Sequence, residues 1–96
     1  MKNAHQRDVL VIGAGPAGLA AAAALAGAGK SVTVLERKPY VGGRAYSYEH
    51  PALGEVVDSQ HVLVGCCTNL IDFYRRIGAD HLIRWSRTIH FREANG

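Results

Sequence analysis

The amino-acid sequence predicts an α/β fold that begins with a β-α-β unit, because three segments of suitable composition follow one another. Val9–Ile12 is a continuous apolar run rich in β-branched residues, which is typical of a parallel strand buried on both faces. Residues 19–26 are dominated by alanine, the strongest helix former. Residues 31–35 have the composition of a second strand, so residues 8–36 close one unit with a right-handed crossover.

The ends of this first helix are indicated by residues with special backbone properties. Pro16 falls in the expected first turn, where a missing N–H group is tolerated. Gly27 and Gly29 favour an end to the helix.

The segment after residue 36 predicts an inserted hairpin, a second helix and a last strand. Residues 44–48 and 55–58 form two short strands around a turn, and residues 88–92 resemble a further strand. A helix is expected over residues 69–77, capped by Thr68 or Asn69, with Asp72 in its first turn and Gly78 at its end. Its apolar face would consist of Leu70, Phe73, Tyr74 and Ile77.

The last two residues, Asn95 and Gly96, are a hairpin-turn signal without a returning strand. We therefore expect residues 1–96 to be the N-terminal part of a larger domain whose sheet is incomplete.

Composition narrows the possible partners. Hydrophobic residues make up 48% of the 96 residues, as in a globular protein, although a chain this short has a thin core. The net charge is +3 and the basic residues are scattered, which argues against nucleic-acid binding and leaves a weak attraction to an anionic membrane surface open. The longest stretch of low polarity, residues 17–28, spans roughly 18 Å as a helix and is too short to cross a bilayer.

The cysteines and aromatic residues give no sign of special chemistry. Cys66 and Cys67 are adjacent, so we expect reduced, buried and inert thiols in a cytoplasmic protein. Together with His61 they lack zinc-ligand spacing, so no metal site is predicted. Phe73, Tyr74 and Trp85 are expected in the core, and Arg75 and Arg76 on a solvated helix face.

The glycines between the first strand and the first helix match a dinucleotide-binding fingerprint. Gly13 permits the tight turn, Gly15 lets a pyrophosphate approach the backbone, and Gly18 allows close packing of helix on strand. With Pro16 and Ala17 they form a helix N-terminus that attracts phosphate. Glu36 follows the second strand, where its carboxylate can bind ribose hydroxyls and disfavours a 2′-phosphate. The alternative is that these glycines serve packing alone and Glu36 is a solvated charge.

The segment that follows favours FAD over NAD as the cofactor. From Glu36 through Arg37 to Gly42-Gly43-Arg44, it resembles the E-x-x-x-x-x-G-G-R segment of FAD-dependent amine oxidases and phytoene desaturases. The resemblance implies a Rossmann-like FAD-binding domain in which Arg37, Gly43 and Arg44 contact the cofactor. Independently, paired glycines let backbone approach a ligand, and an arginine can pair with phosphate. A flexible loop with a surface arginine is the alternative.

Residues 55–66 resemble a narrower group, the hydroxysqualene dehydroxylases, whose pattern has an acid, then G-Q-H, an apolar triplet and G-C before an aromatic residue. Ser59 and Cys67 depart from that pattern. The resemblance places Gln60 and His61 near the cofactor and makes His61 a candidate for catalysis. A loop histidine satisfied by backbone is the other interpretation.

The function that the resemblance implies is FAD-dependent removal of the hydroxyl of hydroxysqualene to give squalene, an isoprenoid precursor. A phytoene desaturase or an amine oxidase with the same FAD-binding head is the first alternative. A truncated, non-catalytic dinucleotide-binding fragment is the second. We expect a cytoplasmic protein. Because an apolar small-molecule substrate would come from the membrane, peripheral association with the inner membrane is left open.

Overall fold

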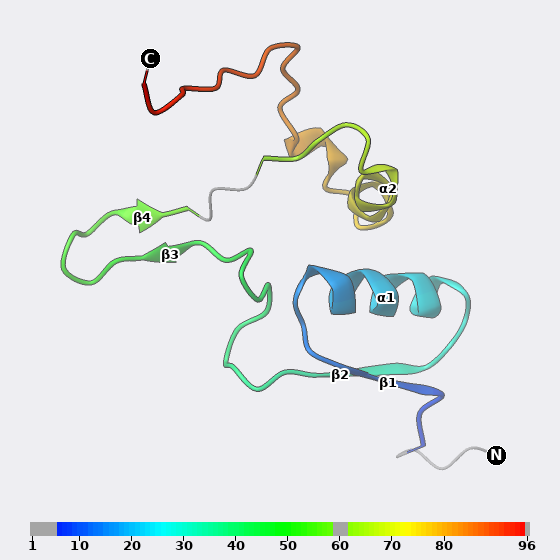
Figure 1. Cartoon of the computed structure of the whole chain (residues 1–96). Coiled ribbons are helices and arrows are strands. Elements are labelled where there is room, and N and C mark those ends of the chain that lie inside the picture. The colour runs from blue at the N-terminus through cyan, green and yellow to red at the C-terminus, as the bar shows by residue number, and fades with distance from the viewer. Residues whose placement is uncertain (1–5, 59–61, 96) are drawn as a thin grey trace.

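The computed structural model describes residues 6–58 and 62–95 and contains the expected β-α-β unit (Figure 1). Strand β1 (Val9–Ile12) leads into helix α1 (Pro16–Gly27), which is followed by strand β2 (Val32–Leu35). The two strands pair in parallel, from Val9 opposite Val32 to Ile12 opposite Leu35. Helix α1 packs on one face of this pair, so the Rossmann-like start predicted from the sequence is confirmed.

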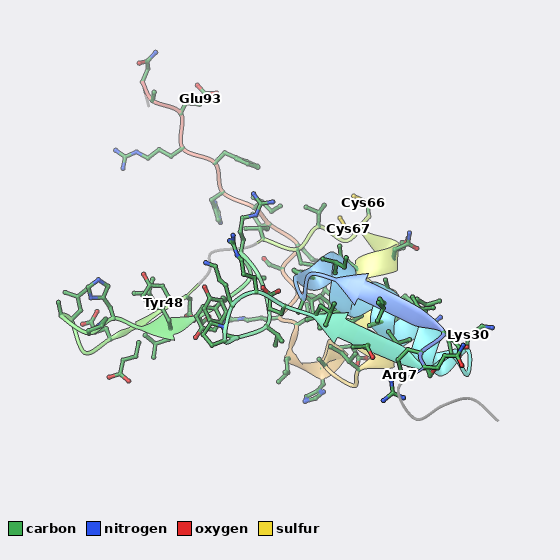
Figure 2. All side chains as sticks on the ribbon, turned by 90° about the horizontal axis from the view of Figure 1, so that it is seen from below. Arg7, Lys30, Tyr48, Cys66, Cys67 and Glu93 are labelled. Atoms are coloured by element: carbon green, nitrogen blue, oxygen red, sulfur yellow. The ribbon has the colours of Figure 1, made fainter. Side chains whose placement is uncertain are left out.

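The second half of the chain contains a small hairpin and a second helix. Strands β3 (Tyr48–Glu49) and β4 (Val56–Val57) pair antiparallel and project to one side of the β-α-β unit (Figure 1). Helix α2 (Thr68–Arg76) packs against α1 and is followed by the short 3₁₀ turn η1 (Asp80–Leu82). Tyr48, on the hairpin, lies at the opposite end of the molecule from Lys30 (Figure 2).

Two strand predictions need correction. The hairpin is present, but its strands are two residues each and not the longer segments 44–48 and 55–58. Residues 88–92 lie within the described chain and form no strand. A strand requires a hydrogen-bonding partner, and this segment runs away from α2 with Phe91 87% exposed (Figure 1).

The predicted capping of α2 is correct at one end only. The N-cap residue is Cys67, and no side chain hydrogen-bonds the first turn, so neither Thr68 nor Asn69 caps the helix. Asp72 lies beyond the first turn, where it accepts a hydrogen bond from Nε of Arg76 at 2.8 Å. At the other end Gly78 adopts a φ of 72°, as expected of a glycine just after a helix.

Burial on α2 follows the predicted face only in part, because Phe73 is buried and Leu70 and Tyr74 are half-buried as expected. Ile71 and Phe73 are buried, whereas Ile77 is half exposed beyond the end of the helix. Trp85 is also half exposed and is not a core residue. Cys66 and Cys67 are free and exposed at the start of α2, so the expectation of buried thiols is wrong (Figure 2). Arg75 and Arg76 are exposed, as predicted.

The core is thin, and one face of the sheet is open. Total accessible surface is 8484 Å², against about 5,400 Å² for a compact chain of this mass. Val11 faces α1, where its Cγ1 lies near Gly18, so Leu10 and Ile12 point to the opposite face. Because they are 61% and 87% exposed, β1 is covered on one face and not on both as predicted. Neither described α-helix has the length and apolarity that crossing a membrane requires.

The contact between α1 and the loop before it depends on Gly18. A Cβ atom at this position would overlap the carbonyl oxygen of Gly13 and lie 3.3 Å from Cγ1 of Val11. Backbone cannot move aside as a flexible side chain can, so only glycine fits here.

We expect Gly18→Ala to lower the free energy of unfolding by about 1–3 kcal/mol through overpacking. Gly27→Ala is the matched control, because its Cβ would meet only Nη1 of Arg76, at 3.9 Å. That change should be neutral or stabilising by up to about 1 kcal/mol. Urea unfolding followed by circular dichroism measures both, and equal midpoints for the two variants would contradict the close-packing role.

Candidate functional site

The loop between β1 and α1 is held in a tight turn that presents the start of the helix. Gly13 has a φ of 102°, and its N–H donates to the carbonyl of Leu35 at 2.7 Å. Gly15 is the N-cap residue, Pro16 begins the helix, and no side chain caps it. The first N–H groups of a helix have no partner within the helix, so this end suits an anionic group.

The second glycine segment docks directly on this loop. The N–H of Gly42 donates to the carbonyl of Ala14 at 2.7 Å. Gly42 and Gly43 both have positive φ, at 115° and 59°. A Cβ on Gly43 would lie 3.2 Å from Cα of Gly15, which is closer than ordinary van der Waals contact, so the two backbones approach closely here. The paired glycines therefore serve contact between two loops as well as room for a ligand.

The carboxylate of Glu36, directly after β2, is hydrogen-bonded to the same loop. Oε2 of Glu36 accepts a hydrogen bond from the N–H of Ala14 at 2.7 Å, and Oε1 accepts one from the N–H of Lys38 at 3.1 Å. These hydrogen bonds, the one from Ala14 foremost, hold the pKa of the Glu36 carboxyl below its ordinary value of 4.5. A carboxylate has about four acceptor positions, so it can still bind hydroxyl groups.

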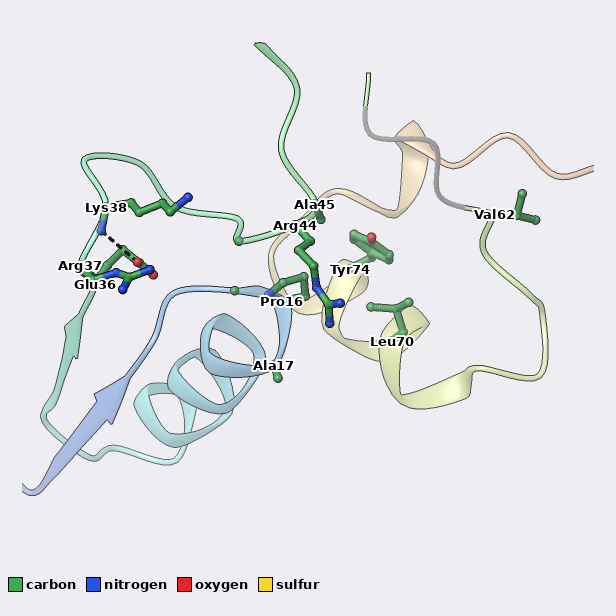
Figure 3. A pocket seen from close by; sticks show the side chains of 12 residues that line it. Pro16, Ala17, Glu36, Arg37, Lys38, Arg44, Ala45, Val62, Leu70 and Tyr74 are labelled. Atoms are coloured by element: carbon green, nitrogen blue, oxygen red, sulfur yellow. Dashed lines mark hydrogen bonds between the residues drawn. The ribbon is translucent and has the colours of Figure 1, made fainter. Parts of the chain in front are cut away.

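These segments enclose one end of a cavity of about 870 Å³ (Figure 3). Glu36, with its neighbours Arg37 and Lys38, lies at one end of it, and Pro16 and Arg44 lie in the middle. The other end is apolar. It is lined by Val62, Leu70 and Tyr74. Along its length, the cavity is thus lined first by the carboxylate of Glu36, then by the N-terminus of α1 and Arg44, and last by apolar side chains.

The structure brings most of the predicted site residues together. Those that line the cavity are Gly15, Pro16, Ala17, Glu36, Arg37, Gly43 and Arg44. Gly13 and Gly18 shape the loop without lining the cavity. Gln60 and His61 lie outside the described residues. The cofactor contacts of all these residues stay predictions.

Sequence reasoning missed five lining residues, which are Lys38, Ala45, Val62, Leu70 and Tyr74. Leu70 and Tyr74 were assigned to the core, because their helical spacing does not distinguish a packed face from a cavity wall. Both are half-buried in the structure. Lys38 and Ala45 adjoin predicted residues, which is the signal that could have found them.

A row of aromatic rings runs from the rim of the cavity to the hairpin. Nζ of Lys38 donates to the hydroxyl of Tyr40 at 3.2 Å and lies 5.6 Å from the centre of its ring. Tyr40 stacks on Tyr46 with ring centres 4.0 Å apart, and Tyr48 follows at 6.4 Å. The rings connect the second glycine segment to β3.

In residues 6–58 and 62–95, His, Cys, Asp and Glu side chains do not gather in groups of three that could hold a metal ion.

Comparison with known proteins identifies the family. Residues 11–77 match the NAD(P)-binding Rossmann-like domain, and the chain belongs to this family. It is 47% identical over 68 residues to lysine-specific histone demethylase 1B of Mus musculus, covering 71% of this chain and 8% of that protein. It is 42% identical over 72 residues to the hydroxysqualene dehydroxylase of Zymomonas mobilis, covering 74% of this chain and 17% of the relative.

A solved structure of putrescine oxidase bound to putrescine superposes with a TM-score of 0.66 at 42% identity, covering 76% of this chain and 16% of that one. The chain thus spans less than a fifth of the length of each of these three proteins. The relatives fall in the FAD-dependent amine oxidase and desaturase superfamily, so the resemblance and the FAD cofactor predicted from the sequence are confirmed.

The lowered pKa of Glu36 predicts a pH dependence of stability. A carboxyl whose pKa is depressed on folding contributes stability that is present above its ordinary value, here 4.5, and lost as the pH falls through the lower folded value. The difference in free energy of unfolding between the wild type and Glu36→Gln should therefore shrink as the pH is lowered below 4.5. Urea titrations without added cofactor, repeated across this range, measure it. A difference that does not vary with pH would show that the carboxylate contributes nothing through these amides.

Proposed function

We propose that this chain binds FAD in an oxidoreductase that acts on an isoprenoid substrate, converting hydroxysqualene to squalene. The observation that carries the FAD assignment is the order of groups along the cavity: Glu36, then the α1 N-terminus with Arg44, then the apolar end. The substrate is supported by 42% identity to a hydroxysqualene dehydroxylase and by the pattern in residues 55–66.

In this proposal each part of the cavity receives one part of the cofactor. Glu36 accepts hydrogen bonds from the adenosine ribose, and its charge rejects a 2′-phosphate. The diphosphate is bound by N–H groups at the start of α1 and by the guanidinium of Arg44. The riboflavin half then extends toward Leu70 and Tyr74. The glycine contacts fit such a ligand, because a Cβ at Gly43 would press on the loop that forms the phosphate site.

Bound FAD supplies hydride chemistry. Replacing the hydroxyl of hydroxysqualene by hydrogen consumes one hydride and one proton and releases water. This chain's part in the reaction is to fix the cofactor and to surround its reactive half with apolar side chains.

We extend the proposal to the setting of the protein. An apolar substrate of this kind partitions into membranes, so we propose a cytoplasmic protein that associates peripherally with the inner membrane. The net charge of +3 favours an anionic lipid surface weakly.

An amine oxidase is the second candidate, favoured by the structural match to putrescine oxidase. The two candidates share the cofactor and differ in what the substrate part of the site accepts.

The cofactor assignment predicts that Glu36→Arg weakens FAD binding about tenfold or more, since it removes a charge-assisted acceptor at the ribose. Glu49→Arg makes the same charge change in β3, outside the cavity, and should leave binding unchanged. Titration of the flavin-free protein with FAD, followed by flavin fluorescence, measures the dissociation constants. Equal affinities for both variants and the wild type would refute the ribose role.

The substrate assignment predicts that the full-length FAD-loaded protein converts hydroxysqualene to squalene when a chemical reductant is supplied. In air and without reductant, the same protein should leave putrescine untouched. Gas chromatography with mass spectrometry detects squalene, and a peroxidase-coupled assay detects the hydrogen peroxide that amine oxidation produces. Peroxide release from putrescine without squalene formation would favour the amine oxidase.

A further inference from the structure

A second cavity, of about 570 Å³, adjoins the apolar end of the first. Residues 62–65, residues 83–86 and Ile89 contribute most of its lining. Val62 and Tyr74 line both cavities, so the second continues from the first at the end farthest from Glu36.

The lining of this second cavity is apolar. Leu63, Ile83, Trp85 and Ile89 contribute to it, and Trp85 and Ile89 are 55% and 57% exposed. The hydroxyl of Ser86 is engaged with backbone, donating to the carbonyl of Thr88 at 3.0 Å and accepting from its N–H at 3.3 Å. This pair of hydrogen bonds spans the bend at Arg87, shortly before Ile89.

Arg84 is the charged residue of the lining. A long arginine side chain can lay its aliphatic stem along an apolar surface while its guanidinium stays in water. The lining therefore suits an uncharged chain more than a polar or ionic ligand.

The position of this cavity determines what it can receive. Adenosine at Glu36 and diphosphate at Arg44 would direct the reactive half of the cofactor toward Tyr74 and Val62. A molecule in the second cavity would then lie beside that reactive half. We infer that the cavity binds the hydrocarbon chain of the substrate, with Trp85 and Ile89 as its main contacts. The identity of this occupant rests on the proposed function; the cavity itself does not.

The test uses the FAD-loaded protein and farnesol, a linear isoprenoid alcohol, as the probe. Ile89→Glu places a carboxylate in the lining and should weaken farnesol binding about tenfold or more. Phe91→Glu is the matched control, since Phe91 belongs to the same segment, is 87% exposed and does not line the cavity. It should change the dissociation constant by less than about twofold. Equilibrium dialysis with labelled farnesol measures binding without turnover, and the FAD content of each variant confirms that it is folded.

Trp85→Ala provides a second, uncharged variant if Ile89→Glu fails to retain FAD. It should also weaken farnesol binding, because it removes the largest apolar surface of the lining. Unchanged farnesol affinity in an FAD-loaded variant of either residue would overturn the inference.

The two proposals can fail separately. If hydroxysqualene is converted but farnesol does not bind, or binds independently of Trp85 and Ile89, the cavity inference is wrong and the proposed reaction stands. If farnesol binding depends on these residues but hydroxysqualene is not converted, the cavity inference holds for an apolar chain and the proposed substrate is wrong.

Discussion

The site depends on how the peptide groups of one residue, Ala14, are hydrogen-bonded. Its N–H donates to the carboxylate of Glu36, and its carbonyl accepts the N–H of Gly42. At 1% exposure, Ala14 is among the few buried residues of the described chain. The loop before α1, the residue after β2 and the second glycine segment are therefore joined at a single point. Because buried backbone groups require partners, neither Glu36 nor the glycine pair can move without leaving one unsatisfied. The cavity is shaped by this junction before any ligand enters it.

The local parts of the site could be predicted from sequence because each has a short-range cause. Gly18 must be glycine to avoid the carbonyl of Gly13, and Pro16 suits a first helical turn. Glu36 follows β2 directly, so its place was set by the strand. The contact between Gly15 and Gly43 joins two such motifs, and spacing alone showed that each was present but not that they touch. Tyr74 could not be assigned to a cavity wall, because helical periodicity does not reveal what a face packs against.

Several of the predictions that failed concern long-range packing. The apolar run of β1 indicated burial on both faces, yet α1 covers only the face of Val11, and Ile12 is exposed. Trp85 was expected in the core on hydrophobicity alone and instead lines an open cavity. Residues 88–92 have strand composition without a partner strand in the described chain. Composition indicates that a segment prefers burial or strand pairing. Whether the segment is buried or paired depends on whether the fold places another element beside it.

Stacked tyrosine rings connect the hairpin to the second glycine segment. Tyr40 and Tyr46 stand on either side of Gly42 and Gly43 in the sequence, and their rings stack face to face. This contact closes the loop that contains the two glycines. Tyr48 extends the stack into β3, and Lys38 joins it to the cavity rim. The hairpin is therefore connected to the Glu36 end of the cavity through side chains as well as through the backbone.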